Sequence, residues 1–335
     1  MATQHAKNII VIGASAGGIT AVSKLLAGFT ATLNAAICIV IHVSGDSKTE
    51  VILKHIQKET VLKCVLPEDN EPIIEGTIYL APANHHMMVS EDKLLIRKGP
   101  YENHWRPAID VLFRSAAAHF GSCATGIILT GLLDDGTSGM SSIKRSGGML
   151  IVQDPAQAEF IDMPTSVLEN VGVDHSLRLE DMPTVIADHY AKLACDTNQV
   201  PADVKLESEI TIRMNSEVDE LKQLADPTSL TCPDCGGLLM KIKNEADPRY
   251  RCYTGHSFSE LALEREQVRG IENSLWVAIR MMEERKNLLN RMSKYSGSSK
   301  NERTEEMTIH IDRLKDMLLQ LSNSYVDIQP DEDKG

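Results

Sequence analysis

The 335-residue sequence lacks long apolar runs, an apolar leader and an excess of basic charge. No apolar run approaches the roughly 20 residues that a membrane-spanning helix needs. The N-terminal residues MATQHAK contain no apolar segment of the kind found in secretory leaders. We therefore expect a cytoplasmic protein with no membrane-inserted part.

Basic residues are outnumbered by acidic ones, 34 Lys and Arg against 47 Asp and Glu, which gives a net charge of −13. This balance argues against a general nucleic-acid-binding protein. The length suffices for one large core and a smaller appended module. Seven cysteines are present, of which three cluster between Cys232 and Cys252. We expect the four scattered between positions 38 and 195 to be reduced.

The stretch Asn8–Gly18, NIIVIGASAGG, predicts a buried strand, a sharp turn at Ser15 and a helix. Small residues on both sides of Ser15 allow that turn, and a helix N-terminus behind it favours developing negative charge. The pattern is that of a nucleophile elbow, although a phosphate-binding or purely structural turn has the same features. A dinucleotide-binding motif is excluded, because Ser15 stands where the second glycine should be.

Short apolar runs alternate with helical patterns from residue 8 to about 170. The predicted strands are 8–12, 35–42, 78–82, 126–130 and 149–153, the predicted helices 48–59, 108–119, 139–145 and 163–170, and the predicted hairpin 87–96. Such alternation indicates a parallel sheet covered on both faces. Functional residues gather at the carboxyl ends of such strands. Ser15, His42 and Asp135 each follow such an end.

These three residues could form a catalytic triad. A serine hydroxyl needs a base to take its proton, and the base needs a third group to hold its tautomer. His42 is the candidate base and Asp135 the candidate carboxylate. On spacing alone, His42 could be a strand-end histidine bonded to backbone, Asp135 could be a turn residue, and Asp134 competes with it.

Six separated motifs carry a resemblance to a known family. They are GASAGG, the strand-end His42, YLAPANHHMMV, RPAIDVLFRSAA, ILTGLLDDGTSGM and IVQDPAQAEF followed by MP. Together they resemble the catalytic domain of the CheB-type chemotaxis protein-glutamate methylesterases over residues 7–190. Position by position, the resemblance implies Ser15 as nucleophile, His42 as base and Asp135, which directly precedes Gly-x-x-Gly, as the carboxylate.

The resemblance implies a doubly wound, mostly parallel α/β sheet and hydrolysis of γ-glutamyl methyl esters on chemoreceptors or related signalling proteins, with glutamine deamidation as a further activity. No cofactor is implied for catalysis. The sequence differs from the family at Ala16, where Thr is usual, at Ala108, where Ser is usual, and at Leu132-Leu133, where Met-Gly is usual. We expect no receiver domain of the kind that many members carry. Two alternatives are a non-catalytic signalling or binding module and an esterase with a substrate other than a chemoreceptor.

Residues 228–260 predict a zinc-ribbon-like module. Cys232-Pro-Asp-Cys235-Gly-Gly is followed by Cys252-Tyr-Thr-Gly-His256, and two close ligand pairs can converge on one tetrahedral ion. Chance clustering is the alternative. We expect a structural zinc bound by Cys232, Cys235, Cys252 and His256, since all four ligand positions are filled.

The remaining segments predict a linker and a helical tail. Residues 196–227 are polar and acidic with no clear period, which indicates a linker, so residues 1–195 should hold a complete catalytic domain. Residues 261–326 carry two apolar stripes with steps of 3 and 4, which favours a helical hairpin or coiled coil. These helices could bind a coiled-coil partner or self-associate.

Overall fold

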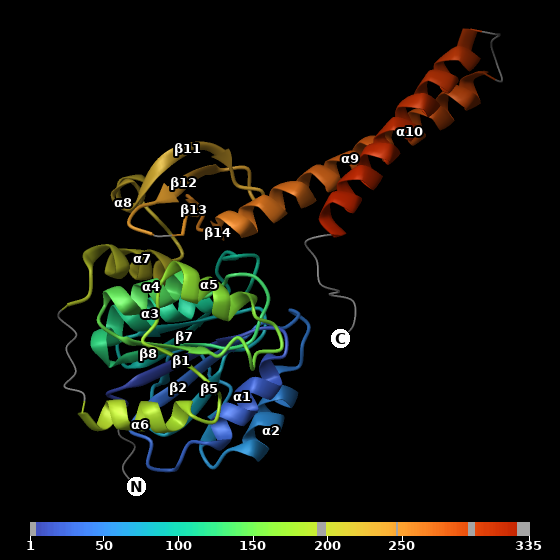
Figure 1. Cartoon of the computed structure of the whole chain (residues 1–335). Coiled ribbons are helices and arrows are strands. Elements are labelled where there is room, and N and C mark those ends of the chain that lie inside the picture. Colours follow the sequence, from blue (N-terminus) through green and yellow to red (C-terminus); the bar gives the residue numbers. More distant parts are fainter. Residues whose placement is uncertain (1–4, 193–198, 246, 294–298, 327–335) are drawn as a thin grey trace. The chain divides into compact units, whose positions relative to one another are not determined.

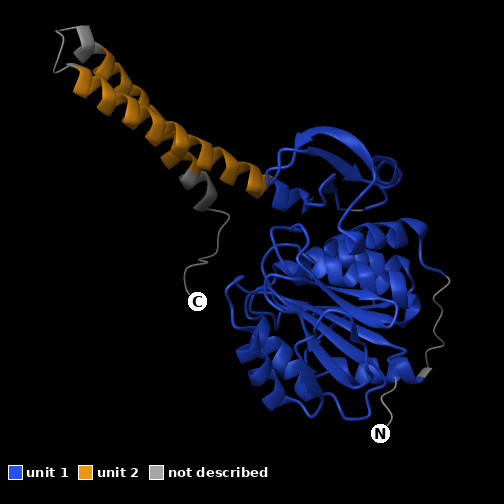
Figure 2. Ribbon diagram, turned by 180° about the vertical axis from the view of Figure 1, so that it is seen from behind, with its two compact units in different colours: residues 1–263 blue, residues 264–335 orange. Residues whose placement is uncertain are grey.

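The computed structural model of this chain describes residues 5–192, 199–245, 247–293 and 299–326. It divides into two compact units, Met1–Leu263 and Glu264–Gly335, which are coloured separately in Figure 2. Each unit is described by itself below.

A parallel sheet forms the centre of the first unit. Its strand order is β10-β9-β8-β1-β2-β5-β3, and every pairing within it is parallel. The strands are β1 (Ile9–Ala14), β2 (Ala36–Ile41), β3 (Lys63–Val65), β5 (Thr77–Leu80), β8 (Ala124–Ile128), β9 (Met149–Gln153) and β10 (His175–Leu177). All residues of β1 and β2 are buried, as expected for apolar runs covered on both faces.

Helices cover both faces of this sheet (Figure 1). Side chains of α1 (Gly18–Ala27), α2 (Thr49–Glu59) and α6 (Met182–Lys192) form the core on one face. Those of α3 (Ile109–Phe120), α4 (Thr137–Arg145) and α5 (Asp162–Asn170) form it on the other. A short 3-10 turn, Gly121–Cys123, follows α3. The predicted doubly wound α/β fold is thereby confirmed.

The order of the strands places β1 at a switch point. From β1 the chain runs outward through β2 to one edge, and it later returns to β8 on the other side of β1. In open α/β sheets, ligands bind at the carboxyl ends of the strands at such a point. A small antiparallel sheet consists of β4 (Glu71–Pro72), β7 (Lys93–Arg97) and β6 (His86–Ser90). Its strands β6 and β7 form the hairpin predicted at residues 87–96.

The predicted linker at 196–227 is wrong. Two helices, α7 (Ala202–Arg213) and α8 (Val218–Leu224), occupy most of it, and α7 packs on α3. Val204 and Ile210 of α7 are buried with the acidic Glu207. Glu207 is paired with arginines of other elements instead of being hydrated, which is why a polar, aperiodic sequence forms a packed helix here. Residues 1–263 are therefore one unit rather than separate domains joined by a linker.

A four-stranded antiparallel sheet, called the ribbon below, lies in the predicted module. It consists of β11 (Ala225–Thr231), β12 (Leu238–Ile242), β13 (Arg249–Cys252) and β14 (Ser257–Ser259), in sequence order. Its small core comprises Cys232, Leu239, Tyr250, Cys252, Phe258, Ala262 and Leu263.

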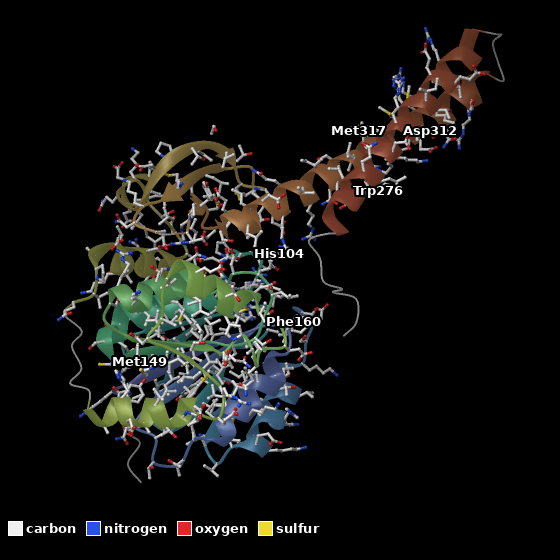
Figure 3. All side chains as sticks on the ribbon, viewed as in Figure 1. His104, Met149, Phe160, Trp276, Asp312 and Met317 are labelled. Atoms are coloured by element: carbon white, nitrogen blue, oxygen red, sulfur yellow. The ribbon has the colours of Figure 1, made fainter. Side chains whose placement is uncertain are left out.

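Two long helices form the second unit, α9 (Glu260–Ser293), which begins in the ribbon unit, and α10 (Ser299–Val326). Their contact buries Ile279, Ile311 and Leu318, with Leu275, Met282, Met307 and Leu314 partly buried, so the predicted hairpin is confirmed. Large apolar side chains also remain on the helix surfaces, among them Trp276 and Met317 (Figure 3). The residues between the two helices, 294–298, lie outside the described part of the chain. Among the described helices, none has the length and hydropathy required to span a membrane.

The cysteines outside the ribbon divide into free and bonded residues. Cys38 and Cys64 are free thiols, as expected. Burial raises the pKa of both, to about 11 for Cys64, so neither is a reactive thiolate. Cys123 is disulfide-bonded, contrary to the expectation of a reduced thiol, and Cys195 lies outside the described residues.

Candidate active site

Ser15 lies in the turn between β1 and α1. Its N–H donates to the carbonyl of Thr130 (3.0 Å), which follows β8, and its own carbonyl accepts from the N–H of Gly18 (2.8 Å). Gly17 has a φ of +72°, a left-handed conformation that glycine adopts at no steric cost. A Cβ on Gly131 would lie 2.8 Å from Cβ of Ser15, so only glycine allows this close approach. The turn leaves Ser15 half-buried.

His42 occupies the corresponding position on the neighbouring strand. Ala14 pairs with Ile41, and the N–H of His42 donates to the Ala14 carbonyl (3.0 Å). Ser15 and His42 are thus the first residues beyond two adjacent parallel strands. Nε2 of His42 lies 2.8 Å from Oδ2 of Asp135. The imidazole also stacks on Trp105, with ring centroids 4.2 Å apart and planes 7° apart.

Asp135 is a buried carboxylate surrounded by donors. Besides His42, it accepts hydrogen bonds from the N–H groups of Ile109 (2.7 Å) and Asp110 (3.3 Å) at the start of α3, and from the amide of Asn103 (3.0 Å). Burial alone would raise the pKa of Asp135. The hydrogen bond and the charge interaction with His42, aided by the other donors, outweigh burial and hold this pKa below its usual value.

The ionised state of Asp135 determines which nitrogen of His42 carries the proton. A carboxylate only accepts, so Nε2 of the neutral imidazole is the N–H donor and Nδ1 carries the lone pair. Nδ1 is buried and has no hydrogen-bond partner within the described part of the chain. In the neutral form of His42, the geometry therefore leaves an unpaired nitrogen, Nδ1, next to the strand that ends at Ser15.

A second buried carboxylate, Asp110, lies behind the first. Its Oδ1 accepts from the N–H groups of Gly136 (3.0 Å) and Gly139 (2.7 Å), and its Oδ2 accepts from the Asn103 amide (2.9 Å). Burial and the negative charge of Asp135 raise its pKa well above the usual value. Of these two carboxyl groups, Asp135 therefore carries the negative charge.

The structure brings His42 and Asp135 into contact and places Ser15 at the adjacent strand end; their catalytic roles remain predictions. Asp134, the competitor of Asp135, instead hydrogen-bonds to Ser259 of the ribbon. Sequence reasoning assigned no role to Asn103 or Trp105. The rarity of tryptophan, present only twice in the chain, was the one signal for Trp105.

The four predicted metal ligands also converge. The ligand atoms of Cys232, Cys235, Cys252 and His256 all lie within 4.8 Å of one another. Sγ of Cys252 is 3.7 Å from Sγ of Cys235 and 3.6 Å from Nδ1 of His256. With a Zn–S bond of about 2.3 Å, the edge of a ligand tetrahedron measures about 3.8 Å. These side chains therefore fit a tetrahedral zinc ion.

Comparisons with known proteins match the part of the chain that contains this site. Residues 10–186 match the family described as CheB methylesterase. A protein of Leptospira interrogans, provisionally named protein-glutamate methylesterase/protein-glutamine glutaminase, is 39% identical over 172 residues, which are 51% of this chain and 89% of that protein. The protein-glutamate methylesterase/protein-glutamine glutaminase of Methanosarcina barkeri is 34% identical over 188 residues, 54% of this chain and 51% of that protein.

A solved structure, the Thermotoga maritima CheB methylesterase catalytic domain, superposes with a TM-score of 0.51 and 28% identity. It covers 54% of this chain and 97% of its own. The matched region holds the parallel sheet, Ser15, His42 and Asp135, whereas the ribbon and α10 lie outside residues 10–186. The chain belongs to the CheB methylesterase family.

Proposed function

We propose that this chain is a serine hydrolase that removes methyl groups from γ-glutamyl methyl esters on a methylated chemoreceptor or related signalling protein. The observation that carries the proposal is the buried contact between His42 Nε2 and Asp135, which leaves Nδ1 of His42 unpaired beside the strand end of Ser15. The names of the two relatives supply the substrate class.

In the proposed reaction, Ser15 Oγ attacks the ester carbonyl carbon while its proton passes to Nδ1 of His42. The resulting imidazolium retains its Nε2–H bond to Asp135, whose negative charge stabilises it. The carbon–oxygen bond to the methoxy group then breaks, and Nδ1–H protonates the departing methoxide oxygen, so that methanol is released and His42 returns to its neutral form. Water attacks the acyl-serine by the same route in reverse and releases the glutamate carboxylate. With a glutamine amide, ammonia leaves instead of methanol.

The oxyanion of each tetrahedral intermediate needs donors. The turn into α1 supplies the N–H groups of Ala16 and Gly17, which precede the first helical turn and have no helical carbonyl to bond. Removing one such donor typically slows turnover about 100-fold or more. We assign the oxyanion site to this turn because it begins at the nucleophile itself.

The test is methanol release from methylated receptor preparations. Wild type should release methanol, and Ser15→Ala should reduce release to background while its thermal denaturation midpoint stays unchanged. Ser176→Ala, an exposed serine on the edge strand β10, is the matched control and should behave as wild type. Equal release by wild type and Ser15→Ala would refute the nucleophile.

Labelling with a serine-directed fluorophosphonate separates the two alternatives. A non-catalytic binding module would not be labelled at Ser15. An esterase for another substrate would be labelled at Ser15 and would turn over a small activated ester, but would release no methanol from receptors.

We also propose that the ribbon binds one structural zinc through Cys232, Cys235, Cys252 and His256. Two tight turns present these ligands, since Gly236 N–H bonds to the Cys232 carbonyl (2.8 Å) and Gly255 N–H to the Cys252 carbonyl (3.0 Å). The ion would link these two turns and would take no part in ester hydrolysis. Metal analysis of the full chain should give one zinc per chain, and Cys235→Ser should lose it; full-length protein without zinc but with unchanged stability would refute the site.

We propose further that the protein works in the cytoplasm and that its helical tail binds a coiled-coil partner or a second copy. The thiol ligands in the ribbon favour a reducing compartment such as the cytoplasm. The Cys123 disulfide favours an oxidising compartment instead. Exposed Trp276, Val277 and Met281 on α9 supply apolar surface for a partner. Cell fractionation and the molar mass in solution test these two assignments.

A further inference from the structure

The segment joining β7 to α3, residues 98–108, connects the ribbon with the candidate active site. Within it, the backbone N–H of Asn103 donates to the carbonyl of Ser257 (2.8 Å). The backbone N–H of Ser259 in turn donates to the side-chain oxygen of Asn103 (2.8 Å). Both serines belong to β14, which starts directly after His256. His104, the next residue after Asn103, is labelled in Figure 3.

The other end of the Asn103 amide faces the buried carboxylates. Its nitrogen donates to Oδ1 of Asp135 (3.0 Å) and to Oδ2 of Asp110 (2.9 Å), one hydrogen for each. An amide rotated by 180° would place its NH2 group against the N–H of Ser259 and its oxygen against the negatively charged carboxylate of Asp135. The ribbon backbone therefore determines which end of the amide faces Asp135.

Asn103 has little freedom to turn away. It is 4% exposed and has a φ of 49°, a left-handed conformation that asparagine adopts more readily than most residues. All three polar groups of its side chain have partners, two on the carboxylates and one on the ribbon. This is a fully satisfied buried polar network, the kind that fixes a single arrangement.

Buried ion pairs hold the ribbon against this segment. Glu102, next to Asn103, pairs with Arg114 of α3 (2.6 Å) and with Arg251 of the ribbon (3.1 Å). Glu207 of α7 binds Arg249 of the ribbon through both oxygens, each at 2.7 Å. These side chains are no more than 6% exposed, so removing one partner would leave an uncompensated charge in the interior.

We propose that Asn103 is a positioning residue for the catalytic carboxylate Asp135, and that the ribbon supports the active site by fixing the orientation of the Asn103 amide. The inference rests on the proposed hydrolase function. It makes β14 part of the support of the triad, although the hydrogen-bond partner of the His42 ring, Asp135, and its stacking partner, Trp105, both lie outside the ribbon.

The first test is Asn103→Ala with a small activated ester. Loss of one hydrogen bond to a charged group should lower kcat by about 10- to 100-fold, with KM within about twofold of wild type. A purely structural role would lower the melting temperature without lowering kcat at an unchanged KM. Asn70→Ala is the matched control, because Asn70 also has a positive φ (64°) but is exposed and far in sequence from the site.

The ribbon side is tested by two changes at one residue. Ser259→Ala removes the hydroxyl and keeps the backbone N–H, whereas Ser259→Pro removes the N–H that holds Asn103. The proline variant should have a kcat about 10-fold or more below that of the alanine variant. Combined with Asn103→Ala it should give no further loss, since both changes break the same connection. If Asn103→Ala fails to fold, this pair decides the proposal.

A spectroscopic measurement separates this inference from the proposed function. The proton on Nε2 of His42, bonded to Asp135, gives a low-field NMR signal in 15N-histidine-labelled full-length protein. It should move in Asn103→Ala and Ser259→Pro and stay in place in Asn70→Ala and Ser259→Ala. If wild type is inactive but the signal moves in Asn103→Ala and Ser259→Pro, the proposed hydrolase function is refuted and the positioning role is supported. An active wild type with unchanged kcat and signal in both variants refutes the positioning role. A loss of kcat in Asn103→Ala alone refutes the role of the ribbon.

Discussion

At the scale of single residues, two adjacent aspartates have different environments. Asp135 accepts hydrogen bonds from four donors, one of which is His42, whereas Asp134 contacts Ser259 of the ribbon. Spacing alone could not separate them. The backbone of the folded turn determines which of the two carboxylates faces His42, and the sequence does not reveal that backbone conformation.

We predict that Asp135→Asn lowers kcat by about 1,000-fold or more, because an amide cannot hold the Nε2–H tautomer of His42 as a carboxylate does. Asp134→Asn should lower kcat less than about fivefold. Ester hydrolysis at saturating substrate measures both, with circular dichroism as the check on folding. Equal losses, or a greater loss in Asp134→Asn, would contradict the assignment.

Asp134 should also make stability depend on pH. Burial, with the charges of Asp247 and Asp135, raises the pKa of Asp134 to about 6, despite a hydrogen bond from Ser259. Its pKa in the unfolded chain is about 3.9, so the folded state binds the proton more tightly. Wild type should therefore lose about 2 kcal/mol as the pH rises from 4 to 6.

Asp134→Asn has no charge to bury and should lack this loss. The difference in unfolding free energy between variant and wild type should grow by about 2 kcal/mol in favour of the variant between pH 4 and pH 7. Urea denaturation at several pH values measures it. A constant difference across that range would show that Asp134 is not perturbed.

At the scale of elements, the loop after β8 carries a strained residue. Leu133 has a φ of 69°, a conformation that costs a leucine about 1 kcal/mol or more. The resemblance to the methylesterases places glycine at this position. Backbone geometry thus explains the usual glycine, and its absence here costs stability.

We predict that Leu133→Gly leaves the protein as stable as wild type or up to about 1 kcal/mol more stable, since the relief of strain offsets the added freedom of the unfolded chain. Leu132→Gly is the control, because Leu132 has no positive φ and its change should cost about 1 kcal/mol. Urea midpoints compare the two. Equal destabilisation by both substitutions would exclude strain at Leu133.

Strands and helices of the first 190 residues could be predicted because their apolar runs and periods coincide with the buried faces. The helices of residues 196–227 could not, since α7 buries Glu207 in contact with arginines that follow about 40 residues later. A charged residue in a sequence predicts a solvent-exposed position unless the oppositely charged residue that pairs with it is known. Asn103 was missed for a similar reason, because its three partners come from α3, the turn after β8 and the ribbon.

At the scale of the whole molecule, the catalytic sheet, α7 and the ribbon act as one folding unit. Ile212 of α7 packs against a cluster that contains Met88, Leu95 and Val111 of the catalytic part. Val200 and Val204 join the main core on the α3 face. The segment after residue 195 thus supplies apolar side chains to the core that the sequence assigned to residues 1–195 alone.

Two truncations test this unit. A chain ending at Leu263 keeps every element of the first unit and removes only residues 264–335. It should retain the melting temperature of that unit and turn over a small ester within a few-fold of full length. A chain ending at residue 195 loses Val200 and Val204, whose burial is worth about 1.5–3 kcal/mol each, together with the partly buried Ile212. This sum is a large part of the roughly 5–15 kcal/mol of a typical domain. It should be largely unfolded or aggregated, and any folded fraction should hydrolyse the ester slowly, because the Ser259 N–H that orients Asn103 is gone. A stable and fully active 1–195 fragment would show instead that the sequence had placed the domain boundary correctly.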